Sequence, residues 1–287
     1  MRIVDAHAHV WEEDNKSYPW DLSLGIQPNF SAPVESLLGE MEENGVQSTV
    51  LVQPSNYGFD NSYLIDSVRR YSQRFVGVAL VNPWAEDVGS RLEWLVERSD
   101  IRGARLVAAL NPQAPWLDRQ LTHAFWAKAD DLGIPICVLV RPVQLPQLER
   151  VVAEWTSVRV VVDHLGHAMV DPTPANLDDR SLLRLARYPN VYVKVSGLPV
   201  ISHKPYPHRD VFPFIREVLE SFGPHRLMWS SDFPYIQQQC GYGRALAIVR
   251  DEIPFFSDED RAWILGKTAS TLWPQLLAET SESRLQP

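Results

Sequence analysis

Two histidines and an aspartate alternate along the first segment of the chain, which reads Asp5-Ala6-His7-Ala8-His9. If residues 3–10 form a β-strand, Asp5, His7 and His9 share one face, because side chains alternate across a strand. Two imidazoles at this spacing can share one metal ion or one substrate atom. The alternative is a buried polar pair that neighbouring groups satisfy. The segment therefore indicates a site without fixing its chemistry.

Two later apolar segments also end in groups that can bind metals or move protons. Asp163-His164 ends the segment 158–164, and Asp232 ends the segment 227–232. Three neutral imidazoles and one carboxylate suit a single borderline divalent cation with one open position. The carboxylate can also accept a proton from a bound water. The predicted metal ligands and catalytic residues are His7, His9, His164 and Asp232.

These residues need a scaffold that brings distant segments to one point. Short apolar segments typical of buried parallel strands alternate with segments of helical periodicity, and no linker divides the series. This pattern predicts an α/β fold, one (β/α)₈ TIM barrel domain over residues 1–287, with a tail that frays after about residue 280. A Rossmann-like sheet is the alternative, but the first strand-to-helix turn lacks its Gly-rich fingerprint. The predicted strands are 3–10, 48–53, 75–81, 103–107, 135–140, 158–164, 191–196 and 227–232.

The ends of the predicted strands are unusually polar. In a TIM barrel the carboxyl ends of the strands form the active site, so polar side chains there are candidates for substrate contacts. Each also has a structural interpretation: Asp163 can orient a neighbour, and Lys194 can be an outward solvated residue. Lys194 and Ser196 share one face, so both point inward or both point outward. The candidates at strand ends are Ser55, Arg105, Arg141, Lys194 and Ser196.

Composition limits the classes of partner. The net charge of −9 over 287 residues disfavours a nucleic-acid surface, which needs concentrated Lys and Arg. No stretch approaches the roughly 20 apolar residues that span a bilayer, and we find no secretory signal. Two cysteines are too few for a disulfide framework. We therefore expect a soluble cytoplasmic protein without nucleic-acid or membrane partners, and we leave a homo-oligomer open.

Three motifs resemble the amidohydrolase superfamily: Asp5-Ala6-His7-Ala8-His9, Val162-Asp163-His164-Leu165-Gly166 and Trp229-Ser230-Ser231-Asp232-Phe233-Pro234. The resemblance covers essentially the whole chain. It is closest to the branch that includes 2-pyrone-4,6-dicarboxylate lactonase and sugar-acid lactonases. Further matching segments are Val52-Gln53-Pro54-Ser55, Arg102-Gly103-Ala104-Arg105, Tyr192-Val193-Lys194-Val195-Ser196-Gly197 and Arg209-Asp210-Val211.

The resemblance implies roles for individual residues. It implies Asp232 as the general base toward water, Arg105 as a clamp for a substrate carboxylate and Arg209 as a further substrate contact. Many relatives carry a metal-bridging carboxylated Lys on strand four or another His on strand five. Here those strands offer Arg105 and Arg141, so we expect one divalent ion, Zn²⁺ or Mn²⁺, rather than two. Some lactonases of this branch work without a metal, so a metal-free site stays open.

The expected activity is hydrolysis of a lactone ring in a small carboxylated, anionic substrate by an activated water. The alternative is a zinc-dependent non-oxidative decarboxylase of an aromatic or enol acid, in which Asp5 would join the site. An amide or imide hydrolase is a third possibility on the same barrel.

Overall fold

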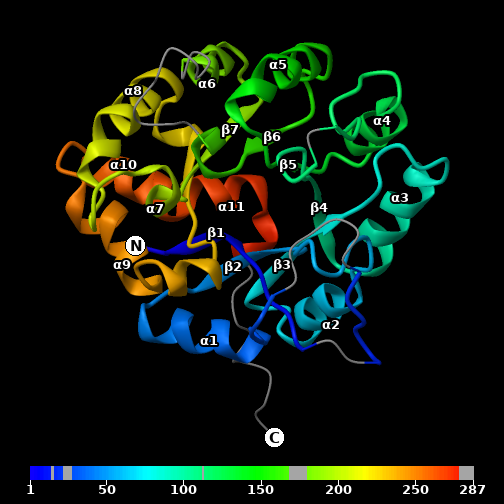
Figure 1. Cartoon of the computed structure of the whole chain (residues 1–287), viewed down its shortest axis with the longest axis horizontal. Helices are drawn as coiled ribbons and strands as arrows, with labels where there is room; N and C mark the ends of the chain where they lie inside the picture. Colours follow the sequence, from blue (N-terminus) through cyan, green and yellow to red (C-terminus); the bar gives the residue numbers. More distant parts are fainter. Residues whose placement is uncertain (14–15, 22–27, 112, 168–179, 278–287) are drawn as a thin grey trace, which may run out of the picture.

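The computed structural model describes residues 1–13, 16–21, 28–111, 113–167 and 180–277. In these residues, eight parallel strands form one sheet in the order β1-β2-β3-β4-β5-β6-β7-β8, surrounded by helices (Figure 1). The predicted single (β/α)₈ barrel is therefore confirmed; the tail after residue 280 lies outside the described residues. The strands are β1 (Val4–Ala8), β2 (Ser48–Val52), β3 (Phe75–Leu80), β4 (Ile101–Leu106), β5 (Ile136–Val138), β6 (Val160–Val162), β7 (Val191–Val195) and β8 (Leu227–Trp229).

The barrel closes where the chain leaves β8 and meets β1. Ala8 and Phe233 form a parallel bridge. The His9 N–H donates to the Phe233 carbonyl over 2.7 Å, and the Asp232 N–H donates to the His7 carbonyl over 3.0 Å. Closure therefore places Asp232 beside the two histidines of the first strand.

Helices cover the outside of the barrel because their apolar stripes pack on the strands. In α1, for example, Val34, Leu37 and Met41 are buried. A capping box at Ser257 begins α10, since Ser257 and Asp260 bond each other's backbone. The helices are α1 (Val34–Glu43), α2 (Ser62–Arg70), α3 (Val88–Arg98), α4 (His123–Asp131), α5 (Leu145–Glu154), α6 (Ser181–Arg184), α7 (Leu198–Ile201), α8 (Phe212–Phe222), α9 (Tyr242–Ala247), α10 (Asp258–Ala262) and α11 (Thr268–Leu272).

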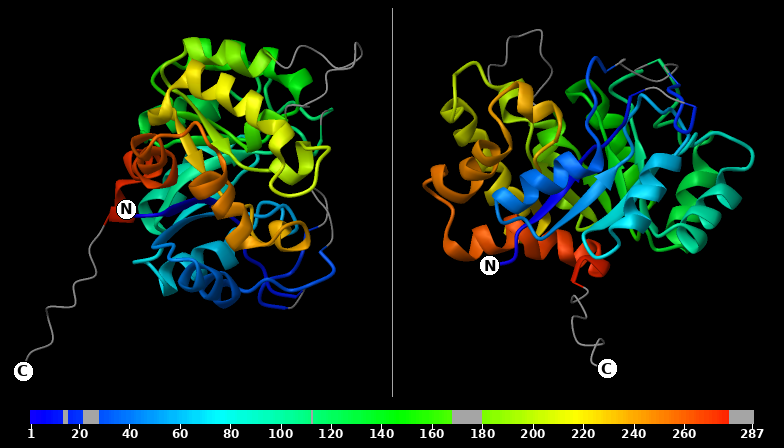
Figure 2. Two further views of the ribbon diagram at one scale, coloured as in Figure 1. Left: turned by 90° about the vertical axis from the view of Figure 1, so that its left-hand side faces the viewer. Right: turned by 90° about the horizontal axis from the view of Figure 1, so that it is seen from below.

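The barrel interior is filled by small and branched side chains and is closed at one end by α11 and the residues that follow it. Val4 and Ala6 pack in one cluster with Leu272, Trp273 and Leu276. The Trp273 indole N–H also donates to the Arg102 carbonyl over 3.0 Å. Figure 2 shows α11 beside the N-terminus, at the end of the barrel where the strands begin. The opposite end, where the strands finish, is left for the site.

All eight strands end before the residue that the sequence pattern suggests, and the difference matters most at the two that precede His164 and Asp232. We expected strands to run to His164 and Asp232, but β6 ends at Val162 and β8 at Trp229. His164 has φ 51° and Asp232 has φ 61°, so both lie in the left-handed region that breaks a strand. The reactive side chains are thus carried on tight turns just past the strands. No helix in the described parts of the chain has the length and apolar character needed to cross a membrane.

Candidate active site

The first strand does not keep a simple alternation. The pairing of β1 with β2 shifts register between Asp5 and Ala8. Val4 and Ala6 therefore lie in the barrel interior, and Asp5 points away from it, toward α9, where Tyr242 donates to its carboxylate over 3.0 Å. The expectation that Asp5 shares a face with His7 and His9 is wrong, because the irregularity reverses the alternation along the strand.

Asp232 and three imidazoles point at one another at the mouth of the barrel. The distances from Asp232 Oδ1 to the Nε2 atoms of His7, His9 and His164 are 3.8, 3.7 and 3.8 Å. His7 Nε2 and His9 Nε2 are 2.9 Å apart. The structure thus brings together all four residues that we expected to form the core of the site.

The imidazoles are oriented from behind by other groups. His9 Nδ1 donates to the Val52 carbonyl at 2.7 Å, which leaves the lone pair of Nε2 facing the centre. His164 Nδ1 lies 2.9 Å from the Ser196 hydroxyl. A Cβ on Gly197, which has φ +70°, would lie only 2.9 Å from the His164 Cβ. Glycine at this position therefore allows the segment that follows β7 to approach His164 closely.

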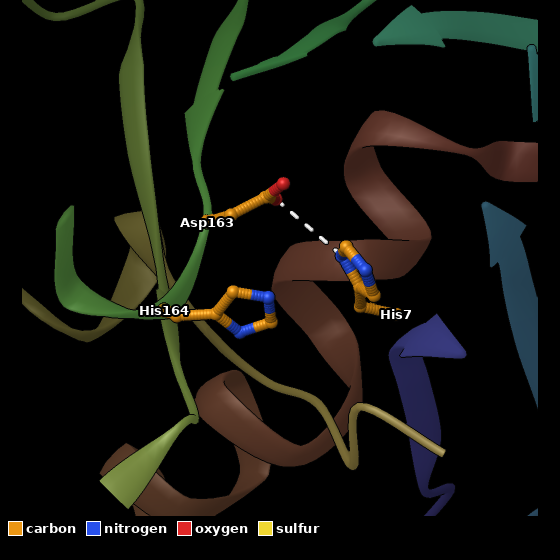
Figure 3. A group of neighbouring side chains, drawn as sticks. All are labelled: His7, Asp163 and His164. Carbon is orange, nitrogen blue, oxygen red and sulfur yellow. Dashed lines mark ion pairs between the residues drawn. The ribbon is translucent and has the colours of Figure 1, made fainter. Parts of the chain in front are cut away.

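The chemistry of the three imidazoles fits a divalent metal. Burial lowers the pKa of His9 to about 3, with a further contribution from the Arg105 guanidinium. Burial also holds the pKa values of His7 and His164 well below their usual range. The rings are therefore neutral near pH 7, which metal binding requires. His7 would bind the ion through Nε2, and its Nδ1 lies 2.8 Å from Lys194 Nζ and 3.4 Å from Asp163 Oδ1 (Figure 3).

A second group of charges lies deeper, around Asp163. Lys194 donates to Asp163 Oδ1 over 2.8 Å, and the Arg105 Nε–H donates to Oδ2 over 3.0 Å. Lys194 also lies 2.8 Å from His7 Nδ1. Burial alone would raise the pKa of the Asp163 carboxyl, but Lys194, His7 and Arg105 together hold it well below its usual range. Asp163 is therefore an ionised counter-charge in a buried network.

Asp232 has the opposite environment. Its carboxylate accepts no hydrogen bond from the described residues, and burial raises its pKa to about 7, although Arg105 opposes this shift. A carboxylate that is half ionised near neutral pH suits the exchange of a proton with a substrate or a water molecule.

The structure separates the expected substrate contacts. Lys194 is fully buried and bonded within the Asp163 network, which favours a structural role over the predicted contact with substrate. Ser196 bonds to His164, and this contact makes it a support for that ring. Arg209 is exposed and pairs with Glu252 at 2.7 Å. These side chains already have partners, which a strand-end position alone does not reveal.

The remaining candidates have side-chain polar atoms that bond no described residue. Arg105 is buried and uses only Nε toward Asp163; its two terminal nitrogens bond no described residue. Ser55 is partly exposed, and its side chain likewise bonds no described residue. Arg141 is exposed and bonds the Ala109 carbonyl at 3.3 Å through Nε. We therefore keep all three as candidates for substrate contacts.

Two features were missed by sequence reasoning. Asp163 is the centre of the ion network, although the sequence suggested only that it orients a neighbour. Tyr235 packs its ring edge-on to His9, with centroids 5.9 Å apart, and so forms part of the wall near the site. The signal for Asp163 was its place directly before His164, whereas nothing in the spacing of Tyr235 indicated its role.

The profile of the amidohydrolase family (Amidohydro_2) matches residues 4–275, nearly the whole barrel. The chain belongs to the amidohydrolase family. It is therefore an enzyme of a hydrolase family, as the arrangement of His7, His9, His164 and Asp232 suggested.

Named relatives of this amidohydrolase act on lactones. A 4-sulfomuconolactone hydrolase from Rhizobium radiobacter is 31% identical over 233 residues, which cover 80% of this chain and 75% of the relative. An L-fucono-1,5-lactonase from Burkholderia ambifaria is 30% identical over 239 residues, 80% of each chain. These names describe the relatives, and the two enzymes act on different lactones.

Solved structures share the whole barrel. A probable 2-pyrone-4,6-dicarboxylic acid hydrolase from Acinetobacter baumannii, with bound citric acid, has a TM-score of 0.81 and 25% identity and covers 95% of this chain and 99% of its own. Two more distant structures share the fold alone. One is a zinc-bound amidohydrolase from Burkholderia multivorans, which is 22% identical and has a TM-score of 0.75. The match covers 96% of this chain and 99% of that structure's chain. The other is a manganese-bound 5-carboxyvanillate decarboxylase from Novosphingobium aromaticivorans, which is 14% identical and has a TM-score of 0.65. The match covers 94% of this chain and 96% of that structure's chain.

Proposed function

We propose that this amidohydrolase opens the lactone ring of a small carboxylated substrate by adding an activated water. The observation that carries the proposal is the position of Asp232, whose Oδ1 lies 3.7–3.8 Å from three imidazole Nε2 atoms. Its carboxylate has no hydrogen-bond donor among the described residues, and its pKa is about 7. Such a group can act as a general base near neutral pH.

The reaction follows from these positions. Asp232 takes a proton from water as the water oxygen attacks the lactone carbonyl carbon. The tetrahedral intermediate then collapses, the bond from carbon to the ring oxygen breaks, and the ring oxygen receives the proton that Asp232 holds. The product is an open-chain hydroxy acid, or its keto form where the ring oxygen was enolic. Asp232 is returned to its carboxylate state.

A divalent ion fits the same residues. His7, His9, His164 and Asp232 would hold it, and Zn²⁺ or Mn²⁺ is the ion that we propose. When bound, it would lower the pKa of water and polarise the lactone carbonyl. Elemental analysis of the purified protein should give at most one such ion per chain, and two per chain would contradict the proposal.

Arg105 supports an anionic substrate. Its Nε is committed to Asp163, while both terminal nitrogens remain free and lie near the core, where the guanidinium influences the pKa values of His9 and Asp232. A planar guanidinium binds a carboxylate through paired hydrogen bonds. We therefore propose that Arg105 binds a carboxylate or a similar anionic group next to the lactone ring, and that Ser55 and Arg141 line the same opening.

The decarboxylase alternative receives less support. It would use Asp5 inside the site, whereas the Asp5 carboxylate faces Ser231 and Tyr242. The likeness to a decarboxylase is limited to the fold at 14% identity.

A substrate panel separates the activities. The purified enzyme is offered carboxylated muconolactones, sugar-acid lactones, pyrone dicarboxylates and hydroxybenzoates. A pH indicator detects acid release from lactones, and ultraviolet absorbance detects decarboxylation of the aromatic acids. We expect turnover of a lactone by the wild type and a kcat lower by about 10²–10⁴-fold in Asp232→Asn. Release of CO₂ from a benzoate, without lactone opening, would overturn the proposal.

A further inference from the structure

The Asp5 carboxylate is fully buried behind the site and accepts four hydrogen bonds. Oδ1 accepts the His7 N–H over 3.1 Å and the Ser231 N–H over 2.9 Å. Oδ2 accepts the Ser231 hydroxyl over 2.5 Å and the Tyr242 hydroxyl over 3.0 Å. A single carboxylate thus joins the strand that carries His7 to the turn that carries Asp232.

The backbone on both sides of Asp232 is hydrogen-bonded at this junction. The Ser231 N–H donates to Asp5, the Asp232 N–H to the His7 carbonyl over 3.0 Å and the Phe233 N–H to the Ser231 hydroxyl over 2.9 Å. Three consecutive amides are therefore held at the junction of β8 and β1. Asp232 itself has φ 61°, a conformation that persists in a non-glycine residue only when its surroundings fix it.

We propose that Asp5 is a positioning residue that fixes the Asp232 carboxylate relative to His7. Asp5 itself does not touch substrate, because its carboxylate is covered by Ser231 and Tyr242. The inference rests on the proposed function in one respect only, namely that Asp232 is the base whose position matters. Asp5 acts within the fold: its carboxylate connects β1 to the turn after β8, and Tyr242 of α9 donates to it from the outer side.

The first test is Asp5→Asn in the full chain. The amide has nearly the same shape but only one acceptor oxygen, and its NH₂ faces other donors. A small misplacement of a catalytic group can cost about 10²-fold in rate, so we expect kcat to fall by about that factor. KM should change by less than about threefold, because substrate binding does not use Asp5.

Tyr242→Phe is the milder second variant, and it remains informative if Asp5→Asn does not fold. It removes one of the four donors and keeps the ring against Trp229 and Phe233. We expect kcat to fall by about 2–10-fold, the rate equivalent of one hydrogen bond. The double variant should be no slower than Asp5→Asn by more than about twofold, since both changes act on the same contact.

Tyr63→Phe is the matched control. Tyr63 is also a buried tyrosine whose hydroxyl bonds within the fold, but it accepts the Val34 N–H at the start of α1 over 3.2 Å. We expect its kcat to equal that of the wild type. Equal losses of kcat in Tyr63→Phe and Tyr242→Phe would indicate general destabilisation and would overturn the inference.

Hydrogen exchange at residues 231–233 provides a readout that does not need a substrate. The amides of Ser231, Asp232 and Phe233 should exchange faster in Asp5→Asn and Tyr242→Phe, and at the wild-type rate in Tyr63→Phe. If no lactone is opened by the wild type, the proposed function fails, and this exchange pattern alone decides the role of Asp5. Wild-type exchange at 231–233 in folded Asp5→Asn, or a change in KM without a change in kcat, would overturn the proposal.

Discussion

Asp163 follows β6 and Asp232 follows β8, and the same side chain serves opposite purposes at these two places. Asp163 is completely buried and is bonded by Lys194 and Arg105, so its pKa is held well below the usual range. Asp232 has a side chain that is 19% exposed and no donor among the described residues, and burial raises its pKa to about 7. Two carboxyl groups whose environments separate their pKa values indicate separate roles, one structural and one reactive.

The largest effect that we expect is on turnover in Asp232→Asn. The amide keeps the shape but cannot accept a proton at neutral pH, so kcat should fall by about 10²–10⁴-fold. The circular dichroism spectrum should stay that of the wild type, because no described residue depends on the Asp232 carboxylate. If kcat of Asp232→Asn stays within about threefold of the wild type, Asp232 is not the reactive carboxylate and its contrast with Asp163 does not hold.

Asp163→Asn should instead damage the fold. The change leaves Lys194 and Arg105 as buried cations without their carboxylate. Removing one partner of a buried ion pair costs about 3–5 kcal/mol. Urea unfolding should show this loss in the free energy of unfolding, while Asp232→Asn shows none. An Asp163→Asn variant as stable as the wild type would show that the deep network does not hold the barrel together.

Arg105 connects the two regions, because Nε belongs to the Asp163 network and the terminal nitrogens remain free. We expect Arg105→Met to raise KM by about tenfold or more, since a clamp acts on bound substrate. Loss of the Asp163 contact should also lower the melting temperature. Arg102→Met, at the other end of β4, is the control and should leave KM unchanged. If the melting temperature falls and KM does not, Arg105 belongs to the network alone.

The smallest effect concerns pH and stability in metal-free protein. The pKa of Asp232 rises from 3.8 in the unfolded chain to about 7 in the folded protein, so its contribution to stability is full below pH 4 and is lost as pH rises to 7. Asparagine carries no such dependence. In the presence of a chelator, Asp232→Asn should therefore gain roughly 1–3 kcal/mol over the wild type between pH 5 and pH 8. An unchanged difference between these pH values would contradict the raised pKa.

The grouping of His7, His9, His164 and Asp232 could be predicted because a barrel gathers the carboxyl ends of its strands at one mouth. The position of Asp5 could not, since the register shift in β1 depends on pairing with β2 rather than on local pattern. The alternation of side chains along the predicted strand 191–196 indicated only that Lys194 and Ser196 point to the same side, inward or outward. Only the structure reveals that Lys194 forms an ion pair with Asp163 and that Ser196 bonds the His164 ring.

The apolar layer that α11 and the residues after it form at the start of the strands also has a consequence for synthesis. Leu272, Trp273 and Leu276 pack against Val4 and Ala6, so residues from both ends of the described chain complete one apolar layer. A ribosome delivers β1 to β8 well before it delivers these three side chains. Until then the interior valines face water at one end, and the nascent barrel lacks its last layer. A premature stop before Leu272 should therefore yield a chain that chaperones retain or proteases remove, even though every residue of the proposed site has been made.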